Sequence, residues 1–160
     1  MFIEMKVSGL TMDPITNTPI VILKDLEEKK AIPIWIGIFE ASAIATEIEK
    51  ITFSRPMTHD LLNDILKVLK ADVVRVEIHD LRNNTFFSNI HLRLAGELII
   101  VDARPSDAIA VALRAGASIF VEDKVIERSR NVDFGTKMTD LDRLKKEKLA
   151  EFLENLSPED

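Results

Sequence analysis

The sequence predicts an α+β fold: a mixed, largely antiparallel sheet packed with three core helices, plus a C-terminal helical tail. Three observations support this prediction. Short segments of alternating apolar and polar residues follow one another closely at the start of the chain. Three later segments carry apolar residues at helical spacing. The last part of the chain, residues 139–160, is rich in charge and carries one apolar stripe.

The first strands are expected before residue 38. Residues 2–10 and 18–24 have strand character, and the turn-rich stretch 13–17 separates them. A charged turn then leads to a third strand at 30–37. Three strands in quick succession indicate an antiparallel start.

Two helices are expected next. Residues 38–51 place isoleucines and alanines on one stripe, directly after Gly37. A second helix is expected at 58–70, with Thr58 as its N-cap, because Pro56 discourages one continuous helix. Its buried face is predicted from helical spacing to contain Leu61, Leu62, Ile65, Val68 and Leu69.

The second half of the sheet follows. Arg82, Asn83 and Asn84 mark a hairpin turn, Pro105 suits the first position of a helix, and Gly116 suits its end. The expected elements are strands 72–80, 85–95 and 97–101, a helix at 106–115 and a last strand at 118–121.

A chain of 160 residues fits one domain, and 46% hydrophobic residues suffice for its core. We place the domain at 1–125. Hydrophobic periodicity fades from about residue 122 to 139, so 126–160 is predicted to be a charged linker and a C-terminal helix.

The composition limits the partners and the cellular location that we expect for this protein. The net charge of −6 argues against a broad basic surface for duplex DNA, so any contact with single-stranded DNA or RNA must be local. The chain has no cysteine, no signal-peptide pattern and no apolar run of the ~18 residues that a membrane span requires. We therefore expect a cytoplasmic protein with no membrane partner.

One short pattern occurs twice. Arg55-Pro56 and Arg104-Pro105 each precede a hydroxyl residue and an aspartate at a predicted helix start. Free backbone N–H groups at a helix start bind anions, and arginine adds a fork for phosphate. We predict that the two segments form one site. The alternative is purely structural: helix caps, acids that complement the helix dipole, and local ion pairs.

Acidic residues lie at or near the same segment ends. The candidates for a divalent metal, Mg²⁺ or Mn²⁺, are Glu40, Asp60, Asp102 and Asp107. Their spacing is not diagnostic of a metal. His59, in the first turn of the second helix, is a candidate general base or ligand, or a hydrogen-bonding residue. His79 and His91 are expected to face outward from their strands.

These segments resemble the bifunctional nuclease domain family. The resemblance covers the chain from near the N-terminus to about residue 125. Its motifs are Ile32-Pro33-Ile34-Trp35-Ile36-Gly37 with Glu40-Ala41 and Ile44-Ala45, Arg55-Pro56-Met57-Thr58-His59-Asp60-Leu61, Thr85-Phe86-Phe87, Val101-Asp102-Ala103-Arg104-Pro105-Ser106-Asp107-Ala108-Ile109-Ala110, and Ile119-Phe120-Val121. The family takes its name from members that degrade both RNA and DNA.

The resemblance implies a nuclease that hydrolyses phosphodiester bonds in DNA or RNA with metal assistance. The residues that we then expect to act are His59, Glu40 and Asp60 in catalysis, Arg55, Thr58, Arg104 and Ser106 in substrate binding, and Glu40, Asp60, Asp102 and Asp107 at the metal. The alternatives are a non-enzymatic module that binds an anion or a partner, and a structural protein–protein domain. We also expect a homodimer, because the early strands tend to leave a sheet edge or apolar face exposed.

Overall fold

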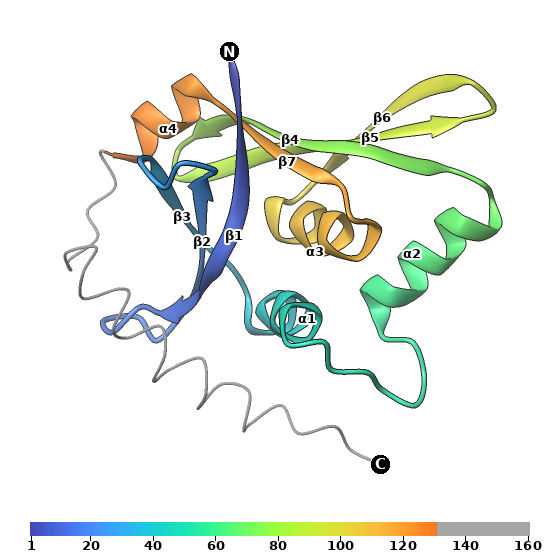
Figure 1. Cartoon of the computed structure of the whole chain (residues 1–160). Coiled ribbons are helices and arrows are strands. Elements are labelled where there is room, and N and C mark those ends of the chain that lie inside the picture. The colour runs from blue at the N-terminus through green and yellow to red at the C-terminus, as the bar shows by residue number, and fades with distance from the viewer. Residues whose placement is uncertain (131–160) are drawn as a thin grey trace.

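The computed structural model describes residues 1–130, which form one sheet with helices against it (Figure 1). The strands are β1 (Phe2–Met12), β2 (Pro19–Asp25), β3 (Ala31–Trp35), β4 (Asp72–Arg82), β5 (Thr85–Leu94), β6 (Glu97–Ala103) and β7 (Ser118–Glu122). The helices are α1 (Ile38–Ile48), α2 (Thr58–Val68), α3 (Pro105–Ala115) and α4 (Asp123–Ser129). The predicted α+β class and the order of elements as far as β7 are confirmed.

The sheet has seven strands in residues 1–130, in the order β3-β2-β1-β7-β4-β5-β6. Every neighbouring pair is antiparallel except β4 and β7, which run parallel. The sheet is therefore mixed and largely antiparallel, as predicted. The parallel pair arises because α3 carries the chain from β6, at the edge, back to β7 in the middle.

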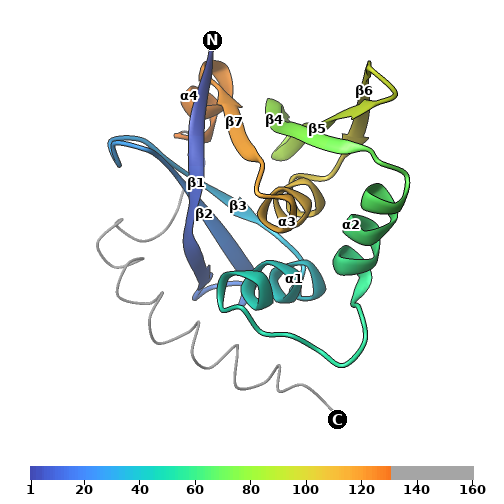
Figure 2. The same cartoon turned by 45° about the vertical axis from the view of Figure 1, so that its right-hand side comes forward.

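Helix α3 lies at the centre of the molecule, beside α1, α2 and the sheet (Figure 2). Its residues Ala108, Ile109, Ala110, Val111 and Ala112 are fully buried. Alanine allows neighbouring elements to approach closely, because the distance between packed helices depends on the side chains at the contact. Pro105 begins this helix, and Gly116 ends it in a left-handed conformation with φ 68°, as the sequence predicts.

The predicted burial of α2 is wrong. Its apolar residues Leu61, Leu62, Ile65, Val68 and Leu69 are 39% to 80% exposed. The helix touches the core through Leu66 and the buried Asn63 instead. Helical spacing shows which face of a helix is apolar, but it does not show whether another element covers that face. The structure also begins α2 at Thr58, so that Met57 and not Thr58 is the N-cap.

Helix α4 was not expected. It extends the fold beyond the boundary predicted at residue 125, because Val125, Ile126 and Ser129 are all buried. The predicted helix within 139–160 lies outside the described residues. No helix in the described part of the chain is long and apolar enough to cross a membrane.

The hairpin of β4 and β5 has the expected turn, with Asn83 and Asn84 both in the left-handed region. The prediction that His91 faces solvent is wrong, since this residue is only 7% exposed. Its Nε2 atom lies 3.2 Å from Oε2 of Glu77, and Arg75 pairs with the same glutamate. Alternation along a strand separates two faces, but a polar face is still buried where charged neighbours cover it.

Candidate functional site

The first site residue follows β3. The chain leaves the sheet at Trp35, and Gly37 caps α1, so that Glu40 falls in the first turn of this helix. A side chain at Gly37 would collide with the carboxylate of Glu40. Glycine therefore leaves room for Glu40 to fold back over the start of its own helix. From there its Oε1 atom accepts a hydrogen bond of 2.8 Å from Arg104.

The starts of α2 and α3 meet at one contact. Nε2 of His59, the second residue of α2, lies 2.8 Å from Oδ1 of Asp107, the third residue of α3. Residues 48 positions apart in the sequence thus share a hydrogen bond. The prediction that the two Arg-Pro segments approach one another is confirmed at this contact.

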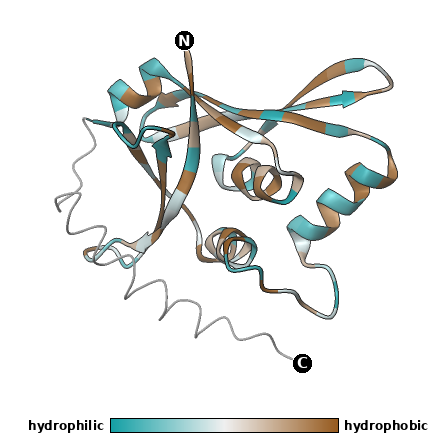
Figure 3. Ribbon diagram, viewed as in Figure 1, coloured by the Kyte–Doolittle hydropathy of each residue, from teal (hydrophilic) through white to brown (hydrophobic). Residues whose placement is uncertain are grey.

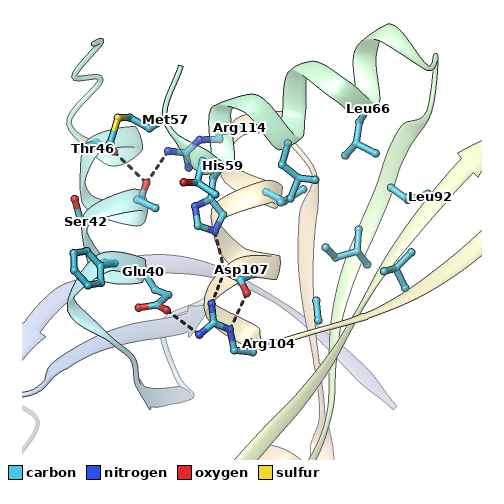
Figure 4. A pocket seen from close by; sticks show the side chains of 18 of the residues that line it. Glu40, Ser42, Thr46, Met57, His59, Leu66, Leu92, Arg104, Asp107 and Arg114 are labelled. Carbon is cyan, nitrogen blue, oxygen red and sulfur yellow. Dashed lines mark hydrogen bonds and ion pairs between the residues drawn. The ribbon is translucent and has the colours of Figure 1, made fainter. Parts of the chain in front are cut away.

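Arg104 links this pair to α1. Its guanidinium donates to both carboxylate oxygens of Asp107, at 2.8 and 3.2 Å, as well as to Glu40 (Figure 4). Burial raises the pKa of Asp107, but hydrogen bonds from Arg104 and His59 outweigh it and hold that pKa below its ordinary value. The hydrogen bonds to Asp107 and Glu40 raise the pKa of Arg104. We call Glu40, Arg104, Asp107 and His59 the polar chain.

Asp60 belongs to a different cluster. Its Oδ1 atom accepts a hydrogen bond of 2.7 Å from Nε of Arg114, and its Oδ2 atom caps α2 by accepting from the backbone N–H of Met57. Burial raises the pKa of Asp60, and the bonds from Arg114 and Met57 lower it further than burial raises it. Asp60 therefore acts as a cap and an ion-pair partner.

Sequence reasoning missed Arg114. Its side chain is only 4% exposed, and its two NH groups donate to the carbonyl oxygens of Ala110 and Ala43, each at 3.0 Å. The residue thereby ties α3 to α1 and α2. A signal was present: Arg114 lies on the same helical stripe as Asp107 and the buried Val111, and an arginine on a buried stripe needs partners.

The polar chain lies at one end of a cavity of about 640 Å³ between α1, α2, α3 and the β5–β6 hairpin. Among the predicted site residues, the lining includes Glu40, Thr58, His59, Asp102, Arg104 and Asp107. Most other lining residues are apolar, from Phe39 on α1 to Leu92 on β5. Three predicted residues fall outside the lining: Arg55, Asp60 and Ser106.

Each of these three residues lies outside the cavity lining for a different physical reason. Ser106 is only 6% exposed, because it faces the core from the first turn of α3. Asp60 turns toward Arg114. Arg55 is exposed on the segment between α1 and α2, and it pairs with no residue in 1–130.

Three of the four predicted metal ligands, Glu40, Asp60 and Asp107, are paired with arginines in this structure. Arg104 lies between Glu40 and Asp107 and pairs with both, Asp60 is paired with Arg114, and Asp102 is on β6. Within the described residues, no three His, Asp or Glu side chains converge on one point. The donor set would fit Mg²⁺ or Mn²⁺ only after Arg104 moved away.

Comparison with known proteins gives a consistent result. The model of the bifunctional nuclease domain matches residues 21–133. Two proteins of Mycobacterium tuberculosis, from strains CDC 1551 / Oshkosh and ATCC 25618 / H37Rv, are each 35% identical to the chain over 163 residues. These alignments cover 98% of this chain and 96% of each relative, and both relatives are described as uncharacterized proteins. The chain belongs to the bifunctional nuclease domain family.

Proposed function

We propose that this protein hydrolyses phosphodiester bonds in single-stranded DNA or RNA, with His59 as the general base. The observation that carries the proposal is the 2.8 Å hydrogen bond between His59 Nε2 and Asp107 in an open cavity. A carboxylate that accepts the proton of Nε2 fixes the tautomer in which Nδ1 is free to accept a proton from water. Membership of the bifunctional nuclease family supports nucleic acid as the substrate.

The polar chain gives each residue a distinct role. Asp107 orients the imidazole and stabilises its cationic form after proton transfer. Arg104 holds Asp107 in place from the other side, and Glu40 holds Arg104. Arg104 and Glu40 therefore act as positioning residues and do not touch the reacting atoms.

Substrate phosphates need a cation that is not already paired. The cavity is lined by three carboxylates and two guanidiniums, so its own charge does not attract a polyanion when His59 is neutral. Arg55 is exposed next to the start of α2 and has no partner in residues 1–130, which favours it as the phosphate contact. Thr58, the first residue of α2, adds a hydroxyl and the N-terminal end of the helix.

The proposal does not require a metal ion, and the cleavage assay tests whether one contributes. Mg²⁺ or Mn²⁺ would supply an activated water and offset charge on the phosphate. None of the roles given above to His59, Asp107 or Arg104 depends on it. We further infer a cytoplasmic location, which the absence of cysteine from the chain supports.

The test is cleavage of end-labelled single-stranded DNA and RNA by the full chain, with Mg²⁺, with Mn²⁺ and with EDTA. His59→Gln keeps an N–H for Asp107 but removes the base, so we expect a loss of about 10²–10⁴-fold. His79→Gln, a change on β4 away from the cavity, is the matched control and should cleave at the native rate. If native protein and His59→Gln cleave equally, the activity does not belong to this site.

Asp107→Asn tests the orienting role separately. An amide at residue 107 can donate to Nε2 and so stabilise the wrong tautomer, and activity should fall by at least about 10²-fold while the protein stays folded. Circular dichroism checks the fold. Native activity in this variant would contradict the role given to Asp107.

One observation favours the alternative, a non-enzymatic module that binds an anion or a partner. The cavity is lined mostly by apolar side chains, as expected of a surface that binds an apolar partner, whereas both of its arginines are already engaged by carboxylates and are not available to an anion. In that case labelled single strands or another ligand would bind without cleavage. Fluorescence anisotropy in parallel with the cleavage assay separates binding from turnover.

A further inference from the structure

The cavity beside the polar chain has a wholly aliphatic end. Val111 of α3 and Ile90 of β5 are buried there, at 0% and 8% exposed, whereas Leu62 of α2 and Val101 of β6 are 39% and 40% exposed. Figure 3 shows hydrophobic colouring along both α2 and the β5–β6 hairpin. We call this end the aliphatic slot, and its side chains, none of which carries a hydrogen-bonding group, are Leu62, Leu66, Ile90, Leu92, Val101 and Val111.

The aliphatic slot adjoins the contact between His59 and Asp107. Leu62 follows His59 by about one turn of α2, and Val111 follows Asp107 by about one turn of α3, so the slot continues the two helix faces that carry this contact. In Figure 4, Leu92 of the hairpin lies on the side of His59 away from α1. A group that occupies the slot therefore lies next to the imidazole.

Polar contacts at the start of α2 explain why the slot stays open. The helix is held to α3 by the hydrogen bond between His59 and Asp107 and by the one between Arg114 and Asp60. These bonds fix the first turn of α2 on α3, and the cavity remains between the following turns and the β5–β6 hairpin. An apolar group that enters the slot removes its walls from water, which favours binding.

The chemistry of the two ends of the cavity restricts the ligand. At the polar end, Arg104 is already paired with the carboxylates of Glu40 and Asp107, so that end does not draw a phosphate inward. The aliphatic slot favours an uncharged group with apolar faces, because a charge would lose its hydration there. A nucleobase meets this requirement, since enzymes that act on nucleic acids hold an unstacked base between apolar side chains. Arg55 lies outside the cavity lining, where the charged backbone of the strand can remain.

We propose that the aliphatic slot binds one unpaired nucleobase of a single-stranded nucleic acid, while the adjoining phosphate stays at the rim near His59 and Arg55. This inference rests on the proposed hydrolysis, and it names the part of the substrate that sets the position of the phosphate. The base is covalently joined to the nucleotide whose phosphate lies beside His59. Burial of the base therefore holds the reacting phosphorus close to the imidazole.

Two consequences distinguish this slot from a groove that binds only phosphates. A base that is paired in a duplex must first leave the stack to enter the slot, so a duplex binds more weakly than a single strand. The side chains of the slot offer no donor or acceptor to the edge of a base, so the sequence of the strand is read weakly. Single strands of A, of C and of T alone should therefore differ by less than about tenfold in affinity.

Fluorescence anisotropy of the full chain carrying His59→Gln, in EDTA, measures binding without cleavage. Two labelled probes of equal length are compared: oligothymidylate, and the same sugar–phosphate chain with tetrahydrofuran in place of every base. Both probes carry the same number of phosphates, so a difference in affinity reports the bases. We expect the abasic chain to bind at least about tenfold more weakly than oligothymidylate.

Leu62→Glu, introduced into the same protein, tests the slot itself. A carboxylate on this wall should lower the affinity for oligothymidylate to that for the abasic chain, because an apolar base face no longer finds an apolar wall. Leu61→Glu is the matched control: it adds the same charge to the same helix at a residue that is 52% exposed and outside the cavity lining. This control should bind oligothymidylate as tightly as the protein with native α2 leucines, and circular dichroism checks that both variants fold.

The outcomes separate this inference from the proposed hydrolysis. Equal affinity for the two probes, or no binding of either, overturns the base site, and so does a Leu62→Glu variant that behaves like Leu61→Glu. If the native protein cleaves the abasic chain as fast as oligothymidylate, hydrolysis stands and the base site is refuted. If oligothymidylate binds through its bases and the native protein never cleaves it, the base site stands and the proposed hydrolysis is refuted.

Discussion

Arg114 should be the largest single polar contributor to the stability of the helical layer. Its guanidinium, 4% exposed, donates to Asp60 on α2, to Ala43 on α1 and to Ala110 on its own helix. Arg114→Met preserves much of the apolar stem but removes all three hydrogen bonds. The carbonyl of Ala43 then keeps the hydroxyl of Thr46 as a donor but loses the guanidinium, and Asp60 loses its cation.

The expected cost follows from the exposure of the partners. Removing one partner of a fully buried charge pair costs about 3–5 kcal/mol. The side chain of Asp60 is 36% exposed, so water can solvate its carboxylate, and we reduce the expected loss to about 2–3 kcal/mol. For a chain of this length, that loss lowers the melting temperature by roughly 5–10 °C.

The assay is urea unfolding at fixed protein concentration, followed by the fluorescence of Trp35, the single tryptophan, and by far-ultraviolet circular dichroism. Arg93→Met, at an exposed arginine of β5, is the control and should change stability by less than about 0.5 kcal/mol. A double-mutant cycle with Asp60→Asn should give a coupling of about 1–2 kcal/mol. A loss below about 0.5 kcal/mol for Arg114→Met, or no coupling to Asp60, would refute this account of how α2 is held.

Two further predictions concern stability. Asp60 and Asp107 have folded pKa values below the unfolded value of about 4, so the stability that they provide is complete above that pH and is lost as the pH falls through the folded values. The urea midpoint should therefore fall between about pH 5 and pH 2, and Asp60→Asn should make this fall smaller; an unchanged acid dependence would contradict the assignment. Gly116→Ala should cost about 1 kcal/mol, because φ is 68° at this helix end and alanine is strained there. An unchanged urea midpoint would show that the backbone relaxes instead.

The sequence alone determined the order of elements and the chemistry available at their ends. Asn83 and Asn84 specified a tight turn, and Pro105 and Gly116 marked the two ends of α3, because these residues restrict or relax backbone angles locally. The same local logic identified the Arg-Pro helix starts. Turns and helix ends can be predicted from the sequence because their backbone angles depend on only a few adjacent residues.

Tertiary structure alone decided which of these groups meet and which are covered. The contact of His59 with Asp107, and the separate capture of Asp60 by Arg114, depend on how α2 and α3 pack, which no local pattern encodes. The apolar stripe of α2 looked like a core face, yet it lies open because no element in residues 1–130 packs over it. Periodicity gives the direction of a side chain relative to its own helix or strand, whereas burial depends on contacts made across the chain.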